Sequence, residues 1–174
     1  MGNRHPDFAP HNAFRCRGEE RWCAIAVTNE EEWQALYEVL GEPPWAQDPK
    51  FTDMNSRVQN AAELEERIEA WTKDRSPHQV MRILQKAGVP AGVVQNGEDL
   101  YLDPHLRARD FLEIIDDPLT GPIEYPRCSV HLSDTPGSLD RWPHLGEANA
   151  EILGELLGCS SDELHRLSEA NILR

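Results

Sequence analysis

Two short apolar runs near the start of the chain predict a pair of strands. Residues 13–16 alternate between apolar and polar side chains, residues 17–20 read as a turn, and residues 22–27 are almost wholly apolar. A short continuous apolar run is typical of a strand that is buried on both faces. We therefore expect the second strand to lie inside the protein, covered on both sides.

Three amphipathic segments downstream predict helices. Each begins at residues that can cap a helix N-terminus: Thr28 with Glu31, Asn60 with Glu63, and Ser76 with Pro77. Gly41 and Gly88 follow the first and third segments, where glycine commonly ends a helix. Residues 91–95 are again mostly apolar and predict a further short strand.

The second half of the chain predicts shorter elements separated by turns. They are brief helices over residues 96–102 and 103–109, and a hairpin over residues 112–125 closed by an Asp-Pro-Leu-Thr-Gly turn. Residues 126–143 are rich in Pro, Ser, Asp and Gly and predict a linker. Two helices are predicted at the end, over residues 147–157 and from Ser160 onward.

These elements predict an α+β fold in which a small sheet is packed by helices. We expect residues 1–125 to form a small α+β domain, residues 126–143 a linker, and residues 144–174 a C-terminal helical pair. Two short helices bury little surface by themselves. Their apolar residues, Ile152, Leu153, Leu156 and Leu164, are therefore expected to pack on another surface of this chain or of a second copy.

The net charge narrows the classes of partner. The chain has 174 residues, with 17 Lys and Arg against 31 Asp and Glu, and thus a formal net charge of −14. Nucleic acid phosphates require positive charge, and an acidic membrane surface would repel this chain. No apolar run is long enough to span a membrane, and the N-terminus has no apolar signal core. We expect a cytoplasmic protein that binds neither nucleic acid nor membrane.

The reactive residues do not form a self-sufficient active site. The four cysteines have no CxxC spacing and predict free buried thiols, with a Cys16–Cys23 disulfide as an alternative in an oxidising compartment. The sequence has no spaced histidine pair for a metal, no phosphate-binding glycine loop and no nucleophile elbow. His5 and His11 flank a proline-rich segment before the first strand, which is either a ligand contact or an ordinary entry loop. We predict no metal site and no permanently bound cofactor.

Short motifs follow one another in a fixed order from Gly2 to Asn149. They are Gly2-Asn3-Arg4-His5-Pro6, Ala9-Pro10, Phe14, Val27-Thr28-Asn29, Trp33, Asp48-Pro49-Lys50-Phe51, Asn55-Ser56-Arg57-Val58, Asn60, Ala87-Gly88-Val89-Pro90-Ala91-Gly92-Val93-Val94, Asp103-Pro104-His105-Leu106-Arg107-Ala108-Arg109, Thr120-Gly121-Pro122, Leu132-Ser133-Asp134-Thr135-Pro136-Gly137 and Leu145-Gly146-Glu147-x-Asn149. Together they resemble the family III CoA-transferases. This group includes formyl-CoA transferase, carnitine CoA-transferase and α-methylacyl-CoA racemase.

The resemblance implies that this chain is one part of a larger architecture. An intact family member has a Rossmann-like large domain made from both ends of its chain, a small domain inserted between them, and two interlocked subunits. By resemblance, this sequence is the small domain, one crossing linker, and C-terminal helices that return to the large domain. We therefore expect a truncated or split protein, which forms a homo-oligomer or pairs with an N-terminal-half polypeptide.

The resemblance also implies a reaction. Family members move CoA between carboxylic acids through an aspartyl-CoA thioester, so acyl-CoA and a carboxylic acid are the expected substrates. The nucleophilic aspartate and most CoA contacts belong to the N-terminal half of the family fold. We therefore predict no catalytic residue in this chain and no activity of the chain alone.

One substrate-facing region is implied as well. In formyl-CoA transferases a glycine-rich loop closes over the thioester intermediates, and Asn3, Arg4 and His5 occupy the corresponding place with Arg-His-Pro instead of glycines. These three residues and His11 are the candidate substrate-loop residues. A cationic Arg4 would suit an acyl group that carries a carboxylate. Ala148 stands where the family often has the His of a Gly-Glu-His-Asn pattern.

Other interpretations stay open at this point. The chain could be a stand-alone, non-catalytic binding or assembly module with the same fold, or part of an acyl-CoA racemase. A hydrolase or metalloenzyme of unrelated class has no supporting motif. The acyl group itself cannot be inferred from the sequence.

Overall fold

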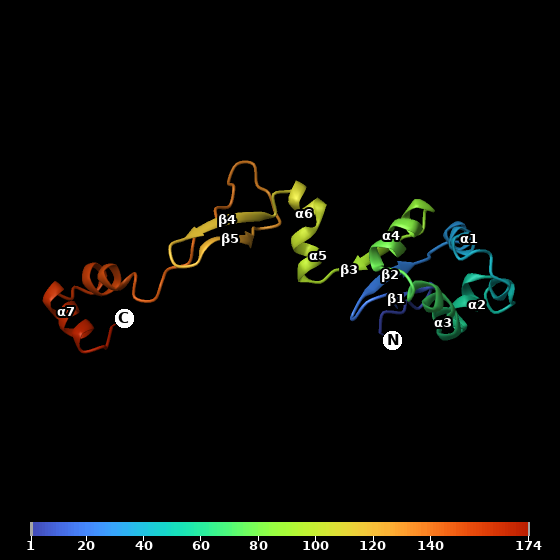
Figure 1. Cartoon of the computed structure of the whole chain (residues 1–174), viewed down its shortest axis with the longest axis horizontal. Helices are drawn as coiled ribbons and strands as arrows, with labels where there is room; N and C mark the ends of the chain where they lie inside the picture. The colour runs from blue at the N-terminus through green and yellow to red at the C-terminus, as the bar shows by residue number, and fades with distance from the viewer. Residues whose placement is uncertain (1, 174) are drawn as a thin grey trace. The chain divides into compact units, whose positions relative to one another are not determined.

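The computed structural model describes residues 2–173, and the chain divides into two compact units, Met1–Asp99 and Leu100–Arg174. Each unit combines helices with a small antiparallel sheet (Figure 1). The predicted α+β fold is therefore confirmed. The predicted limits at residues 125 and 143 stay predictions.

A three-stranded antiparallel sheet lies at the centre of the first unit. Its strands are β1 (His11–Arg15), β2 (Trp22–Ala26) and β3 (Ala91–Val94), in the order β1-β2-β3. Ala24 of β2 lies opposite both Ala13 of β1 and Gly92 of β3. Small residues of all three strands therefore meet at the middle of the sheet.

Helices cover one face of this sheet. They are α1 (Glu30–Val39), the 3₁₀ turn η1 (Pro44–Gln47), α2 (Met54–Gln59), α3 (Ala61–Thr72) and α4 (Pro77–Lys86). The helix α3 contacts β1, while α4 contacts β2 and β3 and runs beside them in Figure 1. Leu64, Ile68 and Leu84 of these helices form one buried cluster with Phe14 and Ile25 of the sheet. This cluster is the core of the first unit.

The second strand is covered on one face only. Cys23 and Ile25 are fully buried, whereas Ala24 between them is exposed and Ala26 is half-buried. The prediction that this strand is buried on both faces is wrong, because the described helices pack against one side of the sheet. The opposite face carries Ala13, Ala24 and Gly92, and no described helix packs on it.

The cap of α1 lies one residue later than predicted. The side chain of Asn29, and not that of Thr28, accepts the backbone N–H of Glu32. The Glu32 carboxylate in turn accepts the Thr28 N–H at 2.6 Å. Glu32 therefore bonds the residue before the N-cap, and the predicted capping box of Thr28 with Glu31 does not form.

The other predicted caps have mixed outcomes. Ser76 and Gln79 cap α4 reciprocally, with Pro77 in its first turn as predicted. Asn60 precedes α3 without capping it through its side chain, because its amide donates to Ser56 O at 2.9 Å. Asn60 instead ends the short helix α2, which was not predicted from the sequence.

A fully buried arginine ties the segments before and after α1 together. The Arg57 guanidinium donates to the carbonyl oxygens of Ala9 and Phe51 at 3.2 Å each, and to both carboxylate oxygens of Glu30 at 3.1 and 2.6 Å. It also lies 4.6 Å from the centre of the Trp33 ring. Buried charge is tolerated when it is paired and hydrogen-bonded. Arg57 thereby fixes the loop that leads into β1.

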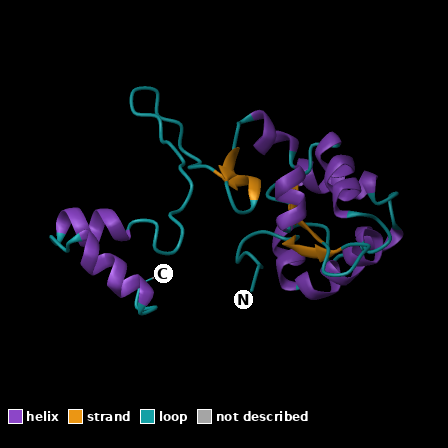
Figure 2. Cartoon of the chain, turned by 60° about the vertical axis from the view of Figure 1, so that its left-hand side comes forward, coloured by secondary structure: helices purple, strands orange, loops and turns teal. Residues whose placement is uncertain are grey.

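The second unit consists of a hairpin and short helices. Its elements are α5 (Gly97–Leu102), which begins in the last residues of the first unit, α6 (Pro104–Ala108), β4 (Leu112–Asp117), β5 (Gly121–Pro126), the π-helical segment η2 (Ala150–Leu156) and α7 (Ser161–Glu169). Figure 2 shows a long loop between β5 and the C-terminal helices, over the predicted linker. Within residues 2–173, every helix is too short or too polar to cross a membrane.

A buried carboxylate closes the hairpin. One oxygen of Asp117 accepts the backbone N–H groups of Leu119 and Thr120 at 2.8 and 2.9 Å, and the other lies 3.2 Å from Nε2 of His144. Burial by itself would raise the pKa of Asp117, but the hydrogen bonds from Thr120 and Leu119 outweigh it, so that the pKa lies below its ordinary value. His144 of the long loop therefore lies against the hairpin turn.

The C-terminal helices differ from their prediction. The first begins at Ala150 and not at residue 147, because Gly146 has a positive φ of 80° and a turn occupies the residues between them. Leu153 and Leu164 are half-buried, whereas Ile152 and Leu156 are 50% and 81% exposed in the single chain. Their coverage by another surface stays a prediction.

The four thiols are free, but they are not all buried. Cys16 and Cys23 lie in the core of the first unit, and burial raises the pKa of Cys23 to about 12. Cys159 is half-buried, and Cys128 is exposed on the long loop. The prediction of buried thiols is therefore wrong for Cys128, because the loop that carries it has no core to enter.

Candidate functional site

The N-terminal loop ends beside the open face of the sheet. His11, the first residue of β1, places Nδ1 at 2.9 Å from the carbonyl oxygen of Asn3. A carbonyl oxygen only accepts, so Nδ1 carries the proton in this contact. In the neutral ring, Nε2 is then left as a hydrogen-bond acceptor. His11 is thus a polar group at the edge of the sheet face.

The His5 ring lies between Phe8 and His11 in the N-terminal loop. Its ring stacks on Phe8, with centroids 4.6 Å apart, and lies 5.4 Å from the His11 ring at a tilt of 52°. Its Nδ1 accepts the backbone N–H of Asp7 at 3.1 Å. His5 therefore supports His11 and the loop around it.

A pocket of about 680 Å³ opens over this face. It is lined by Asn3, His11, Asn12, Ala13, Ala24, Ile25, Ala26, Pro90, Ala91, Gly92 and Val94. Its volume falls within the range of roughly 300–1,000 Å³ that is usual for small-molecule sites. The lining is apolar apart from two amide side chains and one imidazole, so the pocket can hold an apolar group and orient it from the rim.

Arg4 does not join this pocket. Its guanidinium forms a bidentate pair with Glu65 of α3, with Nε–Oε1 at 3.0 Å and Nη2–Oε2 at 2.6 Å. The Glu65 carboxylate raises the pKa of Arg4 through these hydrogen bonds and its charge. Arg4 lines a separate hollow of about 220 Å³ together with Glu66 and Glu69. Of the four candidates, the structure brings Asn3 and His11 to the pocket, keeps His5 beside them and directs Arg4 to the acidic face of α3.

The pocket also contains residues that sequence reasoning missed. Ala13, Ala24, Ala26 and Gly92 form much of its floor, and none was a candidate. The available signal was the alternation of Ala24 and Ala26 with the larger Ile25 and Val27, which burial on one face explains better than burial on both faces.

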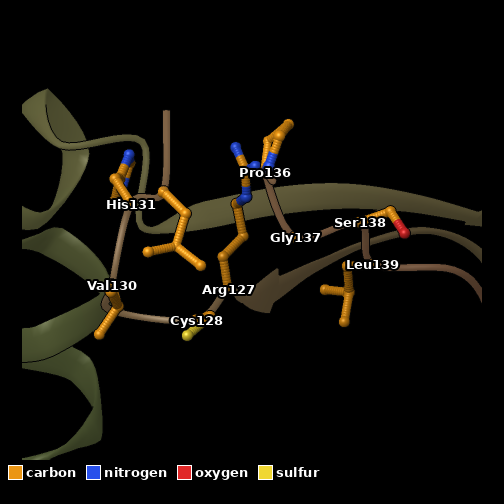
Figure 3. Close-up of a pocket in the computed structure, with 9 residues that line it drawn as sticks. Arg127, Cys128, Val130, His131, Pro136, Gly137, Ser138 and Leu139 are labelled. Carbon is orange, nitrogen blue, oxygen red and sulfur yellow. The ribbon is translucent and has the colours of Figure 1, made fainter. Parts of the chain in front are cut away.

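A second pocket lies wholly in the long loop of the second unit. Figure 3 shows Arg127, His131 and Leu139 around it, and its volume is about 180 Å³. Nε of Arg127 lies 3.0 Å from the Glu113 carboxylate, so its charge is compensated. Most of the lining residues are themselves exposed. This pocket is therefore formed by the loop folding back on itself. As a substrate site it is a weaker candidate than the pocket on the first sheet.

Comparison with known proteins identifies the family. The sequence model of CoA-transferase family III matches residues 1–149. The chain belongs to CoA-transferase family III. The resemblance read from the ordered motifs is therefore confirmed.

Named relatives of this CoA-transferase family III chain include transferases of different acids. It is 33% identical to a probable CoA-transferase of Mycobacterium tuberculosis, covering 97% of this chain and 22% of that protein. It is 33% identical to succinyl-CoA–D-citramalate CoA-transferase of Chloroflexus aurantiacus (99% and 43%) and 29% identical to formyl-CoA:oxalate CoA-transferase of Bradyrhizobium diazoefficiens (99% and 41%). The chain thus spans less than half the length of each of these relatives.

Solved structures support the same assignment. A CAIB/BAIF family protein from Brucella suis matches with a TM-score of 0.77 and 33% identity, over 90% of this chain and 40% of that one. A Mycobacterium tuberculosis protein, Rv3272, matches with a TM-score of 0.65 at 24% identity and bears on the fold alone. The roles of Asn3, Arg4, His5 and His11 stay predictions.

Proposed function

We propose that the chain is the C-terminal part of an acyl-CoA:carboxylate CoA-transferase. In this proposal CoA moves between two carboxylic acids through an aspartyl-CoA thioester, and the nucleophilic aspartate belongs to an N-terminal half of the family fold. Membership of CoA-transferase family III supports the transfer reaction. Because the chain covers only part of its longer relatives, it is also consistent that the nucleophile lies in a part of the family fold outside this chain.

The single observation that carries the role of this chain is the pocket on the open sheet face. Of its lining residues that the structure describes, His11 alone is titratable, and none is an Asp, Glu, Cys, Ser or Lys that could attack a thioester. The pocket can therefore bind and position a substrate but cannot supply the nucleophile. Asn3 and His11 would orient the acyl group, while the rest of the face would exclude water from it.

The proposal also covers the substrates, the partner chains and the location in the cell. The substrates are an acyl-CoA and a carboxylic acid, with CoA bound as a thioester substrate and not as a resident cofactor. The exposed Ile152 and Leu156 would be covered in a homo-oligomer or by an N-terminal-half polypeptide. The acidic chain would work in the cytoplasm.

Reconstitution tests this proposal directly. The purified chain is assayed for transfer of CoA from a panel of acyl-CoA donors to acetate, alone and with an N-terminal-half polypeptide that carries the aspartate. We expect no turnover by the chain alone and turnover by the pair, with an aspartyl-CoA thioester that hydroxylamine converts to an aspartyl hydroxamate with release of CoA. Turnover by the chain alone would contradict the proposal.

Two histidine variants distinguish a role of His11 in the substrate site from a general effect of losing a histidine. His11→Ala should lower kcat of the reconstituted pair, whereas His165→Ala, on the exposed surface of α7, should not. A pair that assembles but never transfers CoA would favour the non-catalytic module. A pair that only exchanges the α-hydrogen of an acyl-CoA with solvent deuterium would favour the racemase.

A further inference from the structure

The floor of the pocket is built from unusually small residues. Ala13, Ala24 and Gly92 stand in register across β1, β2 and β3, and Ala26 continues the row along β2. A Cβ atom placed on Gly92 would meet nothing within 4 Å. The space above Gly92 is therefore open, and larger side chains at these positions would occupy the pocket that lies there.

The rim of the hollow is apolar on the side away from the N-terminal loop. Val94 ends β3 and is 45% exposed, and Pro90 precedes the strand at the other end. An exposed valine over a floor of alanine and glycine offers dispersion contacts and apolar area to a ligand. The hollow thus matches an aliphatic chain better than a polar group.

Positive charge is held away from the hollow. None of the described residues that line it is a lysine or an arginine. Arg4 is paired with Glu65, and the Arg15 guanidinium lies over the Trp22 ring, 4.7 Å from its centre. Arg15 shares this sheet face but stacks at the end of β1 instead of lining the pocket. The described lining of the hollow therefore offers no cation to an acyl group, and the nearest cation on this face, Arg15, stacks on Trp22 beyond it.

The relatives' names supply a useful contrast. Succinyl, citramalate and oxalate all carry a second carboxylate, and burying an ionised carboxylate without a partner is costly. The structure therefore argues against the expectation that Arg4 receives an acyl carboxylate. It favours a substrate whose far end has no charge.

From the size, lining and charge of this hollow we infer that it selects an uncharged aliphatic acyl group. This inference rests on the proposed function, because it names the substrate class of the same site. Gly92 and Ala24 are the specificity-determining residues: their small size admits the chain, and the apolar rim rejects a terminal carboxylate. His11 and Asn3 contact the polar thioester end at the mouth of the hollow.

A pair of matched thioesters tests the inference on the chain itself. Hexanoyl-N-acetylcysteamine and adipoyl-N-acetylcysteamine have six-carbon acyl groups and differ only by the terminal carboxylate of the second. Each is titrated into the ¹⁵N-labelled 174-residue chain, and amide shifts are followed. We expect hexanoyl thioester to shift the amides of Ala24, Gly92 and Val94 and to bind on the order of tenfold tighter than adipoyl thioester.

Variants that fill the hollow provide a second test of the inference. Gly92→Val should weaken hexanoyl thioester binding by about tenfold or more. Gly137→Val is the matched control, because Gly137 also has open space around it and lies on the long loop of the second unit. If Gly92→Val does not fold, Ala24→Leu places the added bulk on the same floor from an exposed position.

The outcomes are distinct. Equal or tighter binding of the adipoyl thioester would overturn the inference, and loss of that binding in Arg15→Gln would show that Arg15 receives the carboxylate. Absence of amide shifts on the sheet face with either thioester would also overturn it. Failure of the reconstituted pair to transfer CoA contradicts the proposed function alone, because thioester binding is measured without turnover. A pair that uses succinyl-CoA and hexanoyl-CoA equally well as CoA donors would contradict this inference alone.

Discussion

The two units use similar side chains but bury them very differently. In the first unit, helices and sheet enclose a core that includes Phe14, Leu36 and Ile68, each at most 2% exposed. In the second unit, the Ile115 side chain is buried and only 6% exposed, whereas Leu119, Leu145 and Leu156 are each more than 75% exposed. Burial of apolar surface is the main stabilising force, so the first unit has a core that can hold its fold, whereas the second leaves apolar side chains exposed, and their coverage by a partner stays a prediction.

The largest expected effect is the removal of a core side chain from the first unit. Leu84 of α4 is fully buried within the cluster that joins the helices to the sheet. Leu84→Ala should lower the free energy of unfolding by about 3 kcal/mol, because it loses burial and leaves a cavity. Urea unfolding followed by tryptophan fluorescence measures this change. A loss similar to that of an exposed leucine would remove the contrast between the units.

A smaller loss is expected when the buried arginine is replaced. Arg57→Leu leaves the carbonyl oxygens of Ala9 and Phe51 without their donors, which should cost about 2 kcal/mol of unfolding free energy. Arg107→Leu in the second unit is the control, because its pair with Glu124 is partly exposed and should contribute less. The same urea titration compares the two variants, and a greater loss from Arg107→Leu would contradict the assignment.

The third effect depends on pH. The Arg21 guanidinium holds the pKa of Asp99 at about 2, below its ordinary value of 3.8. Because the folded pKa is the lower one, the pair stabilises the first unit above about pH 4, and this contribution disappears as the pH falls toward 2. We expect about 1 kcal/mol, after allowance for solvent screening.

Unfolding of the natural chain and of Asp99→Asn at pH 5 and pH 2 measures that contribution. The two proteins should differ at pH 5 and converge at pH 2. A difference that grows on acidification would mean that the sign is wrong.

The smallest effect is expected on the exposed face of η2. Leu156→Ala should change the unfolding free energy of the single chain by less than about 0.5 kcal/mol. The same substitution should weaken association in a homo-oligomer or with an N-terminal-half polypeptide, measured by sedimentation. A change above 2 kcal/mol in the single chain would mean that Leu156 already packs within it.

Local elements were largely predictable from the sequence. Ser76-Pro77 and Gly88 gave the limits of α4, and the turn around residues 117–121 gave the second hairpin, because capping and turn chemistry act over a few residues. Errors arose where two neighbouring residues could serve equally well, as at Thr28 and Asn29. The choice there depends on the path of the chain into the helix, which no local pattern encodes.

The candidate site was only partly predictable. The sequence points to the loop before β1, and Asn3 and His11 of this region line the pocket, although their role in binding stays a prediction. Arg4 was expected to face a substrate, but α3 brings Glu65 to it from 61 residues away. Such a pairing depends on how helix and loop pack, so spacing in the sequence could not reveal it.

The sequence by itself determined the family, the mixture of helices and strands, and the acidic charge. Ordered motifs, residue periodicity and counts carry that information directly. The tertiary structure decided which face of the sheet is covered, and thereby where the pocket lies. The alternation of Cys23, Ile25 and Val27 with Ala24 and Ala26 is compatible with either arrangement until helices pack on one side. Packing links residues far apart in the chain, and that is the physical reason why only the folded molecule reveals the hollow over Gly92.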